Sequence, residues 1–302
     1  EKEACREIVQ LVRHSYATQS TEFEGGRMQM IGLRLDETCP IIGKTVREIC
    51  EEERDFKFGI INVLRDSESH VPWADFEFKH SDTAYFIVKT ERLESLMYML
   101  GKEATPTRSI IILGGSKIGR SIAEQLENEI NVRMIDNSRE KAEWLASNMK
   151  ETMVLHGDGT DVELLKDENI GDADSFIAVT ENEQTNLLSG MLAQNLGVKQ
   201  VVIHVSTTEY MPIVHEIGFG SVLSKNMSTV NSILRQITSD QTEKSVTTFD
   251  EIDVDAVEFN PEPGSKVTKV PLEQINFPED SIVGVINHNG NLSIARGSTQ
   301  LT

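Results

Sequence analysis

Near the middle of the chain lies Ile110-Ile111-Ile112-Leu113-Gly114-Gly115-Ser116-Lys117-Ile118-Gly119, an apolar run that ends in a glycine-containing turn. The apolar run is typical of a buried parallel strand, and apolar residues at helical spacing continue from Ile118. A second apolar stretch, residues 132–135, follows and ends at Asp136. This order of strand, glycine turn, helix and strand predicts a βαβ unit. In such a unit phosphates meet the helix N-terminus and ribose hydroxyls meet the acid.

The composition is that of a soluble globular chain, with 302 residues of which 38% are hydrophobic and 26% are charged. This length predicts two or three domains. The net charge of −20 argues against a nucleic-acid-binding surface, which is expected to be basic. The chain has no apolar run of the roughly 20 residues that span a bilayer, and it opens without a signal peptide. We interpret Cys5, Cys39 and Cys50 as reduced thiols, because their number is odd and no C-x-x-C spacing occurs.

Regions with different patterns follow one another along the chain. An amphipathic helix is expected over residues 1–15, and a polar linker over 18–26. A small β-rich module comes next, with strands predicted at 28–35, 58–64 and 83–88, a loop and short helix at 40–49, and a helix at 92–100. Strands then alternate with helices, which predicts a parallel sheet covered on both faces; these strands are 110–113, 132–135, 152–155, 175–179 and 201–205.

Strand character returns after Ser245, at residues 254–259, 265–267, 282–287 and 292–295. The β-rich module is weakly repeated, because residues 40–49 resemble 263–272 and residues 58–63 resemble 283–288. The second copy ends before any counterpart of residues 85–88 and of the helix after them. Two helix starts in the central region have the capping-box spacing, Thr160-Asp161-Val162-Glu163 and Thr180-Glu181-Asn182-Glu183, and Gly197 fits a helix end.

The glycine turn matches the pattern G-x-G-x-x-G only in part, because Ser116 stands at the second glycine position. A serine hydroxyl could donate to a phosphate oxygen in place of the close approach that glycine allows. The alternative is a turn that joins strand and helix and binds nothing. Asp136 would accept from ribose hydroxyls and repel a 2′-phosphate, which favours NAD(H) over NADP(H). Alternatively, Asp136 caps the helix that follows Asn137-Ser138.

Other polar residues are expected at the same edge of the sheet. Asp158 could accept from adenine or ribose, although turn chemistry in Gly157-Asp158-Gly159 explains it equally. Thr180 and Asn186 surround the start of the helix after the fourth strand; capping explains Thr180, whereas Asn186 is less easily explained. The seven histidines form no H-x-x-x-H pair and no ligand spacing with cysteine. The sequence therefore predicts neither catalytic residues nor a metal site.

Several stretches together resemble an RCK (KTN) domain: residues 112–120, 156–161, 171–180 and 183–188. Residues 40–49 resemble the companion RCK C-terminal domain, and the order of the parts is similar to that of the TrkA family, the regulatory subunits of Trk-type potassium uptake systems. The resemblance implies an α/β fold, a Rossmann-like doubly wound parallel sheet flanked by two small α+β domains. It implies a fragment that lacks most of a first RCK N-domain, with four parts: the final helix and linker of that domain (1–22), a first RCK C-terminal domain (23–105), an RCK N Rossmann domain (106–240) and an incomplete second RCK C-terminal domain (241–302).

The resemblance further implies a cytoplasmic, non-enzymatic regulator that lies at the inner face of the membrane through its partner. That partner would be a potassium-translocating membrane subunit (TrkH-like). It would be gated by a homo-oligomer of this regulator, a dimer or tetramer that forms a ring, with no nucleic acid involved. The cofactor would be NAD or NADH, with ATP or ADP as the alternative. The glycine loop would hold phosphate, Asp136 the ribose, and Asp158 would lie by the adenine. The residues expected to line the cofactor are Gly114, Gly115, Ser116, Lys117, Ile118, Gly119, Asp136, Asn137, Asp158, Thr180 and Asn186.

Two positions depart from the family pattern. Ser116 replaces a usual glycine, and His204 stands at a strand end where many relatives have Arg. Two other functions stay open from the sequence. The chain could be a fragment of an NAD-dependent oxidoreductase whose catalytic part is absent. It could also be a regulator that senses an effector such as a cyclic dinucleotide through its β-rich modules, with a mainly structural Rossmann unit.

Overall fold

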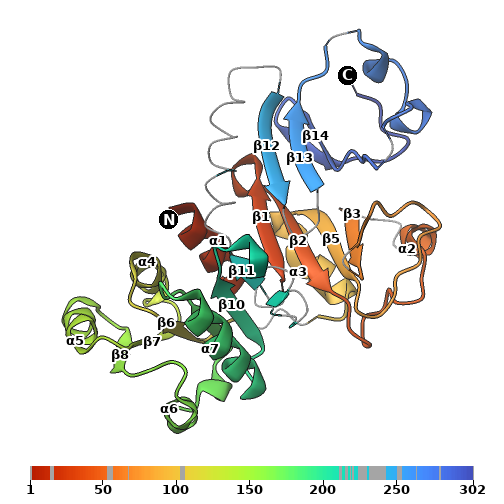
Figure 1. The fold of residues 1–302 in the computed structure, drawn as a ribbon. Helices are drawn as coiled ribbons and strands as arrows, with labels where there is room; N and C mark the ends of the chain where they lie inside the picture. The colour runs from red at the N-terminus through yellow and green to blue at the C-terminus, as the bar shows by residue number, and fades with distance from the viewer. Residues whose placement is uncertain are drawn as a thin grey trace. The chain divides into compact units, whose positions relative to one another are not determined.

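The computed structural model describes residues 2–13, 17–52, 57–66, 68–102, 106–210, 213–214, 217, 219, 221–223, 230, 243–249, 254–262, 264–278 and 280–301. The chain divides into two units, each made of two separate segments (Figure 1). Unit 1 comprises Glu1–Thr18 and Thr105–Val230, and unit 2 comprises Gln19–Ala104 and Asn231–Thr302. Within the described ranges, no helix is both long and apolar enough to cross a membrane.

Unit 1 is built on a parallel sheet with the strand order β11-β10-β9-β6-β7-β8. The strands are β6 (Ser109–Leu113), β7 (Asn131–Asp136), β8 (Met153–His156), β9 (Ser175–Ala178), β10 (Gln200–His204) and β11 (Ser221–Leu223). Numbered along the unit, this is the order 6-5-4-1-2-3 of the doubly wound nucleotide-binding fold. The order reverses between β6 and β9, and ligands of such sheets bind outside the carboxyl ends of the strands at that point.

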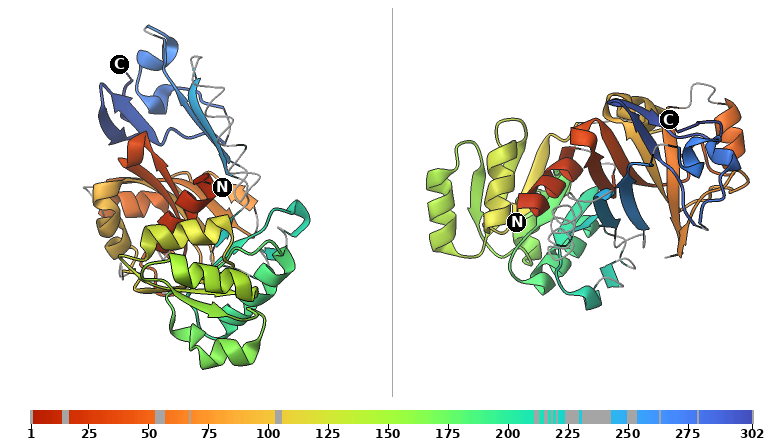
Figure 2. Two further views of the ribbon diagram at one scale, coloured as in Figure 1. Left: turned by 90° about the vertical axis from the view of Figure 1, so that its left-hand side faces the viewer. Right: turned by 90° about the horizontal axis from the view of Figure 1, so that it is seen from above.

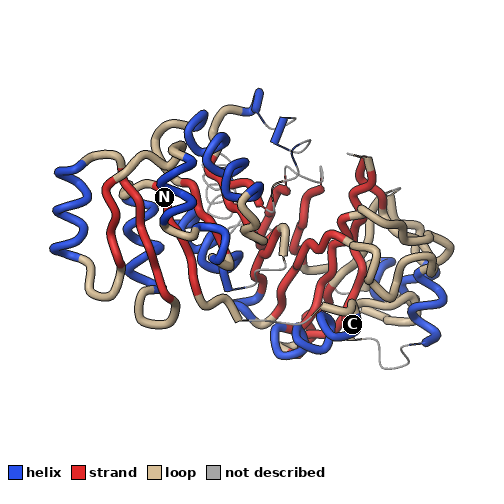
Figure 3. Tube along the Cα trace, turned by 90° about the horizontal axis from the view of Figure 1, so that it is seen from below, coloured by secondary structure: helices blue, strands red, loops and turns tan. Residues whose placement is uncertain are grey.

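Helices connect these strands and cover the sheet (Figure 3). They are α4 (Lys117–Leu126), α5 (Arg139–Asn148), α6 (Val162–Asp167) and α7 (Glu183–Asn195), with short 3-10 turns at Ile170–Asp172 and Thr208–Tyr210. The connections through α4 and α5 run along the sheet in one direction, and those through α6 and α7 run in the other. Because such crossovers are right-handed, the two pairs of helices lie on opposite faces. Strands buried on both faces explain why β6 and β9 are continuous apolar runs.

Helix α1 (Lys2–Arg13) belongs to unit 1, although unit 2 residues separate it from the sheet in the sequence. It lies beside α4 (Figure 2). Ala4, Ile8 and Val12 are fully buried on its apolar side. The Gln200 side-chain amide donates to the carbonyl of Leu11 at 2.9 Å. This helix therefore completes the packing of the Rossmann unit.

Unit 2 contains an antiparallel sheet of order β1-β2-β5-β3-β4. Its elements are β1 (Gln19–Phe23), β2 (Met28–Arg34), α2 (Val46–Glu52), β3 (Phe58–Arg65), β4 (Glu68–His70), β5 (Thr83–Lys89) and α3 (Leu93–Met99), with 3-10 turns at Glu24–Gly26 and Thr90–Arg92. The second segment adds two hairpins, β12 (Glu243–Phe249) with β13 (Val254–Phe259) and β14 (Val285–His288) with β15 (Asn291–Ile294), and 3-10 turns at Lys266–Thr268 and Leu272–Gln274. Both segments share one core, formed by Met28, Met30, Tyr85, Ile87, Phe249 and Leu292.

The sequence repeat has a counterpart in unit 2. An isolated bridge, Thr45↔Glu77, precedes α2 in the first segment, and the bridge Pro271↔Gln300 precedes the 3-10 turn at Leu272–Gln274 in the second. Three local predictions were wrong or incomplete. The polar stretch predicted as a linker contains β1, because its residues pair with β2 from Gln19↔Gly32 to Phe23↔Met28. Residues 265–267 were predicted as a strand, but the structure has a 3-10 turn at Lys266–Thr268 with Ser265 as its N-cap. The strand β12 begins before the predicted strands.

Candidate functional site

The glycine loop between β6 and α4 depends on residues without a Cβ. Gly114 has φ +107°, and a Cβ there would lie 2.9 Å from the backbone nitrogen of Thr180. A Cβ on Gly119 would lie 2.1 Å from the carbonyl oxygen of Gly114, and one on Gly115 would lie 2.3 Å from Leu145 Cδ1. The first glycine therefore permits the turn, and the third lets α4 pack against the end of β6.

Ser116 is the N-cap of α4. Its Oγ accepts from the backbone N–H of Gly119 at 3.3 Å and donates to the carbonyl of Val179 at 3.0 Å. The single hydroxyl hydrogen of Ser116 is therefore held by the end of β9. Lys117 is exposed and Ile118 is buried in the first helical turn. The first turn of any helix presents backbone N–H groups that have no partner within the helix, and these attract anions.

Asp136 ends β7 at the same edge of the sheet, with 4% of its surface exposed. One carboxylate oxygen accepts from the backbone N–H of Gly115 at 2.7 Å, and the other accepts from that of Ser138 at 2.9 Å. The N-cap of α5 is Ser138, not Asp136. The two backbone N–H groups fix the carboxylate, and each oxygen keeps acceptor capacity for a further donor such as a ribose hydroxyl.

Asp158 follows β8, next to Asp136 in the sheet, since Asp136 pairs with His156 and the Gly157 N–H donates to the Asp136 carbonyl. Its Oδ1 accepts from the backbone N–H and the hydroxyl of Thr160, at 2.9 and 2.8 Å. These hydrogen bonds lower the pKa of Asp158. The geometry is that of a turn. The exposed Asn137 directly follows Asp136, and the exposed Asp158 comes after the neighbouring strand β8.

Asn186 is fully buried behind the ends of β9 and β10. Its Oδ1 accepts from the backbone N–H and hydroxyl of Thr180, at 2.9 and 2.6 Å. Its Nδ2 donates to the carbonyls of Thr180 and His204, at 3.1 and 2.9 Å. All of its amide hydrogens are engaged, so Asn186 positions Thr180 rather than reaching a ligand. Thr180 itself lies against Gly114, so the glycine loop and the end of β9 meet here.

Both predicted capping boxes were wrong. Asp161 is the N-cap of α6, and Asn182 is the N-cap of α7. The hydroxyls of Thr160 and Thr180 are instead directed to Asp158 and Asn186. Asp and Asn are at least as favourable as Thr at the N-cap, and each threonine hydroxyl has another acceptor nearby. Gly197 is confirmed at the end of α7, with φ +108° and its N–H donating to the carbonyl of Gln194.

Sequence reasoning missed two charged side chains at this edge. Lys141 Nζ lies 3.8 Å from Asp136 Oδ2, and its place in the first turn of α5 was a usable signal. Glu183, in the first turn of α7, accepts from the backbone N–H groups of Ser206 and Thr207. Burial alone would raise the pKa of Glu183, but hydrogen bonds from this loop hold it below its ordinary value. Glu183 therefore fixes the loop after β10.

Comparison with known proteins identifies the family of the parallel-sheet part of unit 1. Residues 110–225 match the TrkA-N domain family. Residues 110–225 are a TrkA-N domain. The chain that carries this TrkA-N domain is 27% identical over 293 residues to a Trk system potassium uptake protein, TrkA homolog 2, of Methanosarcina mazei, covering 96% of this chain and 64% of that protein. It is 26% identical over 294 residues to Trk system potassium uptake protein TrkA of Vibrio alginolyticus, covering 97% of this chain and 64% of that protein.

Among solved structures, the chain resembles the GsuK RCK domain, with a TM-score of 0.57 and 18% identity over 99% of this chain and 64% of that one. This likeness shows that the chain with the TrkA-N domain has the RCK fold, as predicted. The GsuK channel bound to NAD is similar at a TM-score of 0.56 and 19% identity, covering 98% of this chain and 53% of that one. The chain spans about two thirds of the length of its curated relatives, 64% in both cases above.

Proposed function

We propose that this chain is part of a regulatory subunit of a potassium uptake system and that its TrkA-N domain senses an adenine nucleotide, NAD(H) or ATP/ADP. The carrying observation is the hydrogen bond between Asp136 and Gly115, which puts a fixed carboxylate beside the glycine loop at the switch point of the sheet. Phosphate would meet the N-terminus of α4, with Lys117 nearby, and the ribose would meet Asp136. The names of the relatives, Trk system potassium uptake proteins, support a place in a potassium uptake system.

The residues of the site fit such a ligand. A Cβ at Gly114, Gly115 or Gly119 would collide with protein atoms, so these glycines let the loop pack closely at the start of α4. The bound nucleotide would supply only binding energy, because the regulator performs no chemistry on it. Asn137 and Asp158 would flank the adenosine, and Thr180, held by Asn186, would border the loop on the β9 side.

Regulation requires that the nucleotide bind two conformations with different affinity, because equal affinity shifts no equilibrium. The partner in this proposal is a TrkH-like potassium-translocating membrane subunit, and the regulator lies at the cytoplasmic face as a homo-oligomeric ring of dimers or tetramers. Several nucleotide sites in one ring would steepen the response. Leu188 and Met191 are 48% and 45% exposed on α7, and such apolar side chains favour contact with a further copy.

The test is calorimetric titration of the chain with NADH, NAD, ATP and ADP. Saturable binding of at least one nucleotide is expected, with the Asp136→Ala and Gly119→Val variants losing it. Glu124→Ala is the control, because Glu124 lies exposed on α4 and makes only a 3.8 Å contact with Arg120. Absence of binding by all four nucleotides would contradict the proposal. Consumption of NADH during the titration would favour the oxidoreductase alternative.

A further inference from the structure

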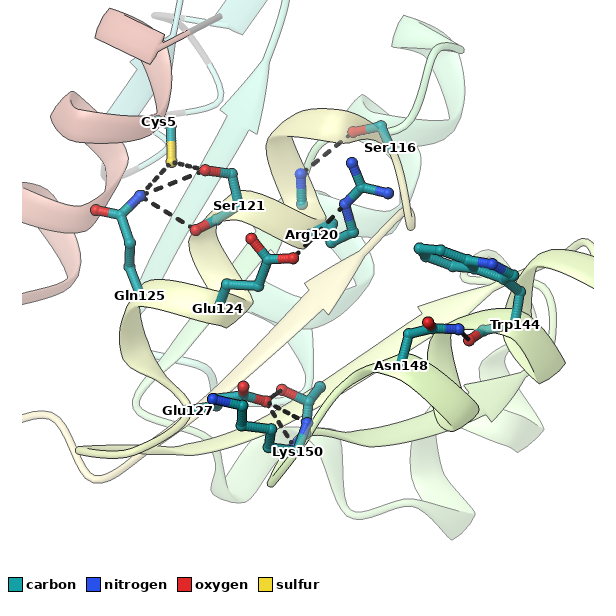
Figure 4. Close-up of polar contacts among 12 residues, drawn as sticks. Cys5, Ser116, Arg120, Ser121, Glu124, Gln125, Glu127, Trp144, Asn148 and Lys150 are labelled. Atoms are coloured by element: carbon teal, nitrogen blue, oxygen red, sulfur yellow. Dashed lines mark hydrogen bonds and ion pairs between the residues drawn. The ribbon is translucent and has the colours of Figure 1, made fainter.

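Ser116 joins the glycine loop to the neighbouring strand end, a role that a glycine at this position cannot fill. Its hydroxyl donates to the carbonyl of Val179 at 3.0 Å. It also accepts from the Gly119 N–H at 3.3 Å at the start of α4, where Figure 4 shows Ser116. Val179 follows β9 and has 2% of its surface exposed. The contact thus bridges β6 and β9 at the point where the strand order reverses.

Other contacts hold Ser116 and Val179 close to each other. A Cβ on Gly114 would lie 2.9 Å from the nitrogen of Thr180, so the loop and the end of β9 already touch. Asn186 holds Thr180 by its backbone N–H, its hydroxyl and its carbonyl. Because Asn186 also binds the carbonyl of His204, the ends of β9 and β10 are fixed together. Neither side of the Ser116–Val179 contact is therefore free to move alone.

A dinucleotide and a mononucleotide differ in whether they extend past the switch point between β6 and β9. In the doubly wound fold the second glycine lets the backbone approach the pyrophosphate, which ADP and NAD share, and only the second half of a dinucleotide continues to the other side of the switch point. Here the second glycine position is Ser116, and its hydroxyl bonds to the Val179 carbonyl across the switch point, where the second half of a dinucleotide would pass. A nucleotide whose phosphates end at α4 needs only Asp136, the loop and the helix N-terminus.

We propose that the Ser116–Val179 contact makes this site selective for adenine mononucleotides, such as ADP, over the dinucleotides NAD and NADH. The inference rests on the proposed function, since it specifies the ligand of that same site. Entry of a dinucleotide requires the Ser116 hydroxyl to leave the Val179 carbonyl, which then loses a hydrogen bond in a buried position. Ser116 is thus a specificity-determining residue.

The experiment compares the dissociation constants of ADP and NADH by calorimetry in the unaltered chain, Ser116→Gly and Ser116→Ala. The unaltered chain is expected to bind ADP at least tenfold more tightly than NADH. Ser116→Gly, which removes both the Cβ and the hydroxyl, should reduce that ratio at least tenfold, and Ser116→Ala should reduce it less. Ser147→Ala is the matched control, because it removes a hydroxyl that donates to the Glu143 carbonyl on α5.

The ratio of the two dissociation constants is measured separately for each variant. Ser116→Gly and Ser116→Ala weaken the N-cap of α4, but any resulting loss of folded protein affects ADP and NADH equally. A ratio of one or below in the unaltered chain would overturn the inference, as would an unchanged ratio in Ser116→Gly. Those results leave the proposed nucleotide sensor standing. Binding of neither ADP nor NADH would overturn the inference, and binding of none of the four nucleotides, NADH, NAD, ATP and ADP, would overturn the proposed function as well.

Discussion

One carboxylate oxygen of Asp136 lies 2.7 Å from the backbone nitrogen of Gly115, which joins the end of β7 to the turn after β6. The other oxygen holds the Ser138 N–H, so the same carboxylate also fixes the start of α5. Two neighbouring βα connections are thereby held together by one side chain. The acid would serve the protein and its ligand at once, through different lone pairs of the same oxygens.

Asp136→Asn should weaken ADP binding about 10- to 100-fold, because a charged acceptor contributes about 1.5–3 kcal/mol to a hydrogen bond. The amide has one acceptor oxygen, so it cannot accept from both Gly115 and Ser138, and the free energy of unfolding should fall by about 1–2 kcal/mol. Calorimetry and urea unfolding measure the two effects. The exposed Asp172→Asn serves as control, and unchanged ADP affinity in Asp136→Asn would remove Asp136 from the site.

Gly119→Ala should lower the free energy of unfolding by about 1–3 kcal/mol, because the added Cβ would meet the Gly114 carbonyl at 2.1 Å and force the backbone apart. Gly284→Ala is a control, since its Cβ would lie 3.4 Å from the nearest atom, Ile61 Cγ2. Its effect should stay within about 0.5 kcal/mol. Urea unfolding compares the two, and equal losses would mean that the packing of α4 on β6 tolerates a methyl group.

Glu127, at the end of α4, should make stability depend on pH. Its Oε2 accepts from the backbone N–H groups of Lys150, Glu151 and Thr152 and from the Thr152 hydroxyl (Figure 4). Burial raises the pKa of Glu127, but these hydrogen bonds outweigh it and hold the pKa below its ordinary value. The stabilisation is therefore present above the unfolded pKa of about 4.3 and is lost as the pH falls through the lower folded value.

Glu127→Gln should accordingly lower the free energy of unfolding by about 2 kcal/mol at neutral pH, and the deficit relative to the unaltered chain should shrink as the solution is acidified. Urea unfolding at a series of pH values measures this. Glu124→Gln on the same helix should show almost no deficit at any pH, because its contact with Arg120 is exposed and long. A Glu127→Gln deficit that grows on acidification would reverse the assigned sign.

Gln200→Leu should loosen α1. The buried Gln200 donates to the Leu11 carbonyl at 2.9 Å and accepts from the Ser175 hydroxyl at 2.5 Å, and leucine leaves both groups without this partner. A loss of about 1–3 kcal/mol is expected. Hydrogen exchange of the α1 amides should rise more than that of β6. Gln194→Leu, at an exposed position of α7, is the control, and unchanged protection of α1 would show that apolar packing alone holds the helix.

The sequence predicted the Rossmann unit well because its signals are local. A continuous apolar run, a glycine turn and a terminal acid follow one another closely in the chain, and Gly114, Gly119 and Asp136 lie where the βαβ pattern places them. The caps were less predictable, since Asp161 and Asn182 compete for the N-cap with Thr160 and Thr180, whose hydroxyls bond to Asp158 and Asn186. The strand β1 was missed because Gln19–Phe23 is polar and gains its strand conformation from pairing with β2. The partners of Ser116 and Gln200 are distant in sequence and leave no local pattern.

The chain crosses between its two units three times, after Thr18, after Ala104 and after Val230. No single cut by a protease can therefore release either unit as one continuous piece. Cleavage near residue 104 would leave α1 on the other fragment from the sheet it covers, and the fragments would stay joined by buried side chains rather than by the backbone. Expression of residues 105–230 alone would likewise expose the α4 surface that α1 now covers.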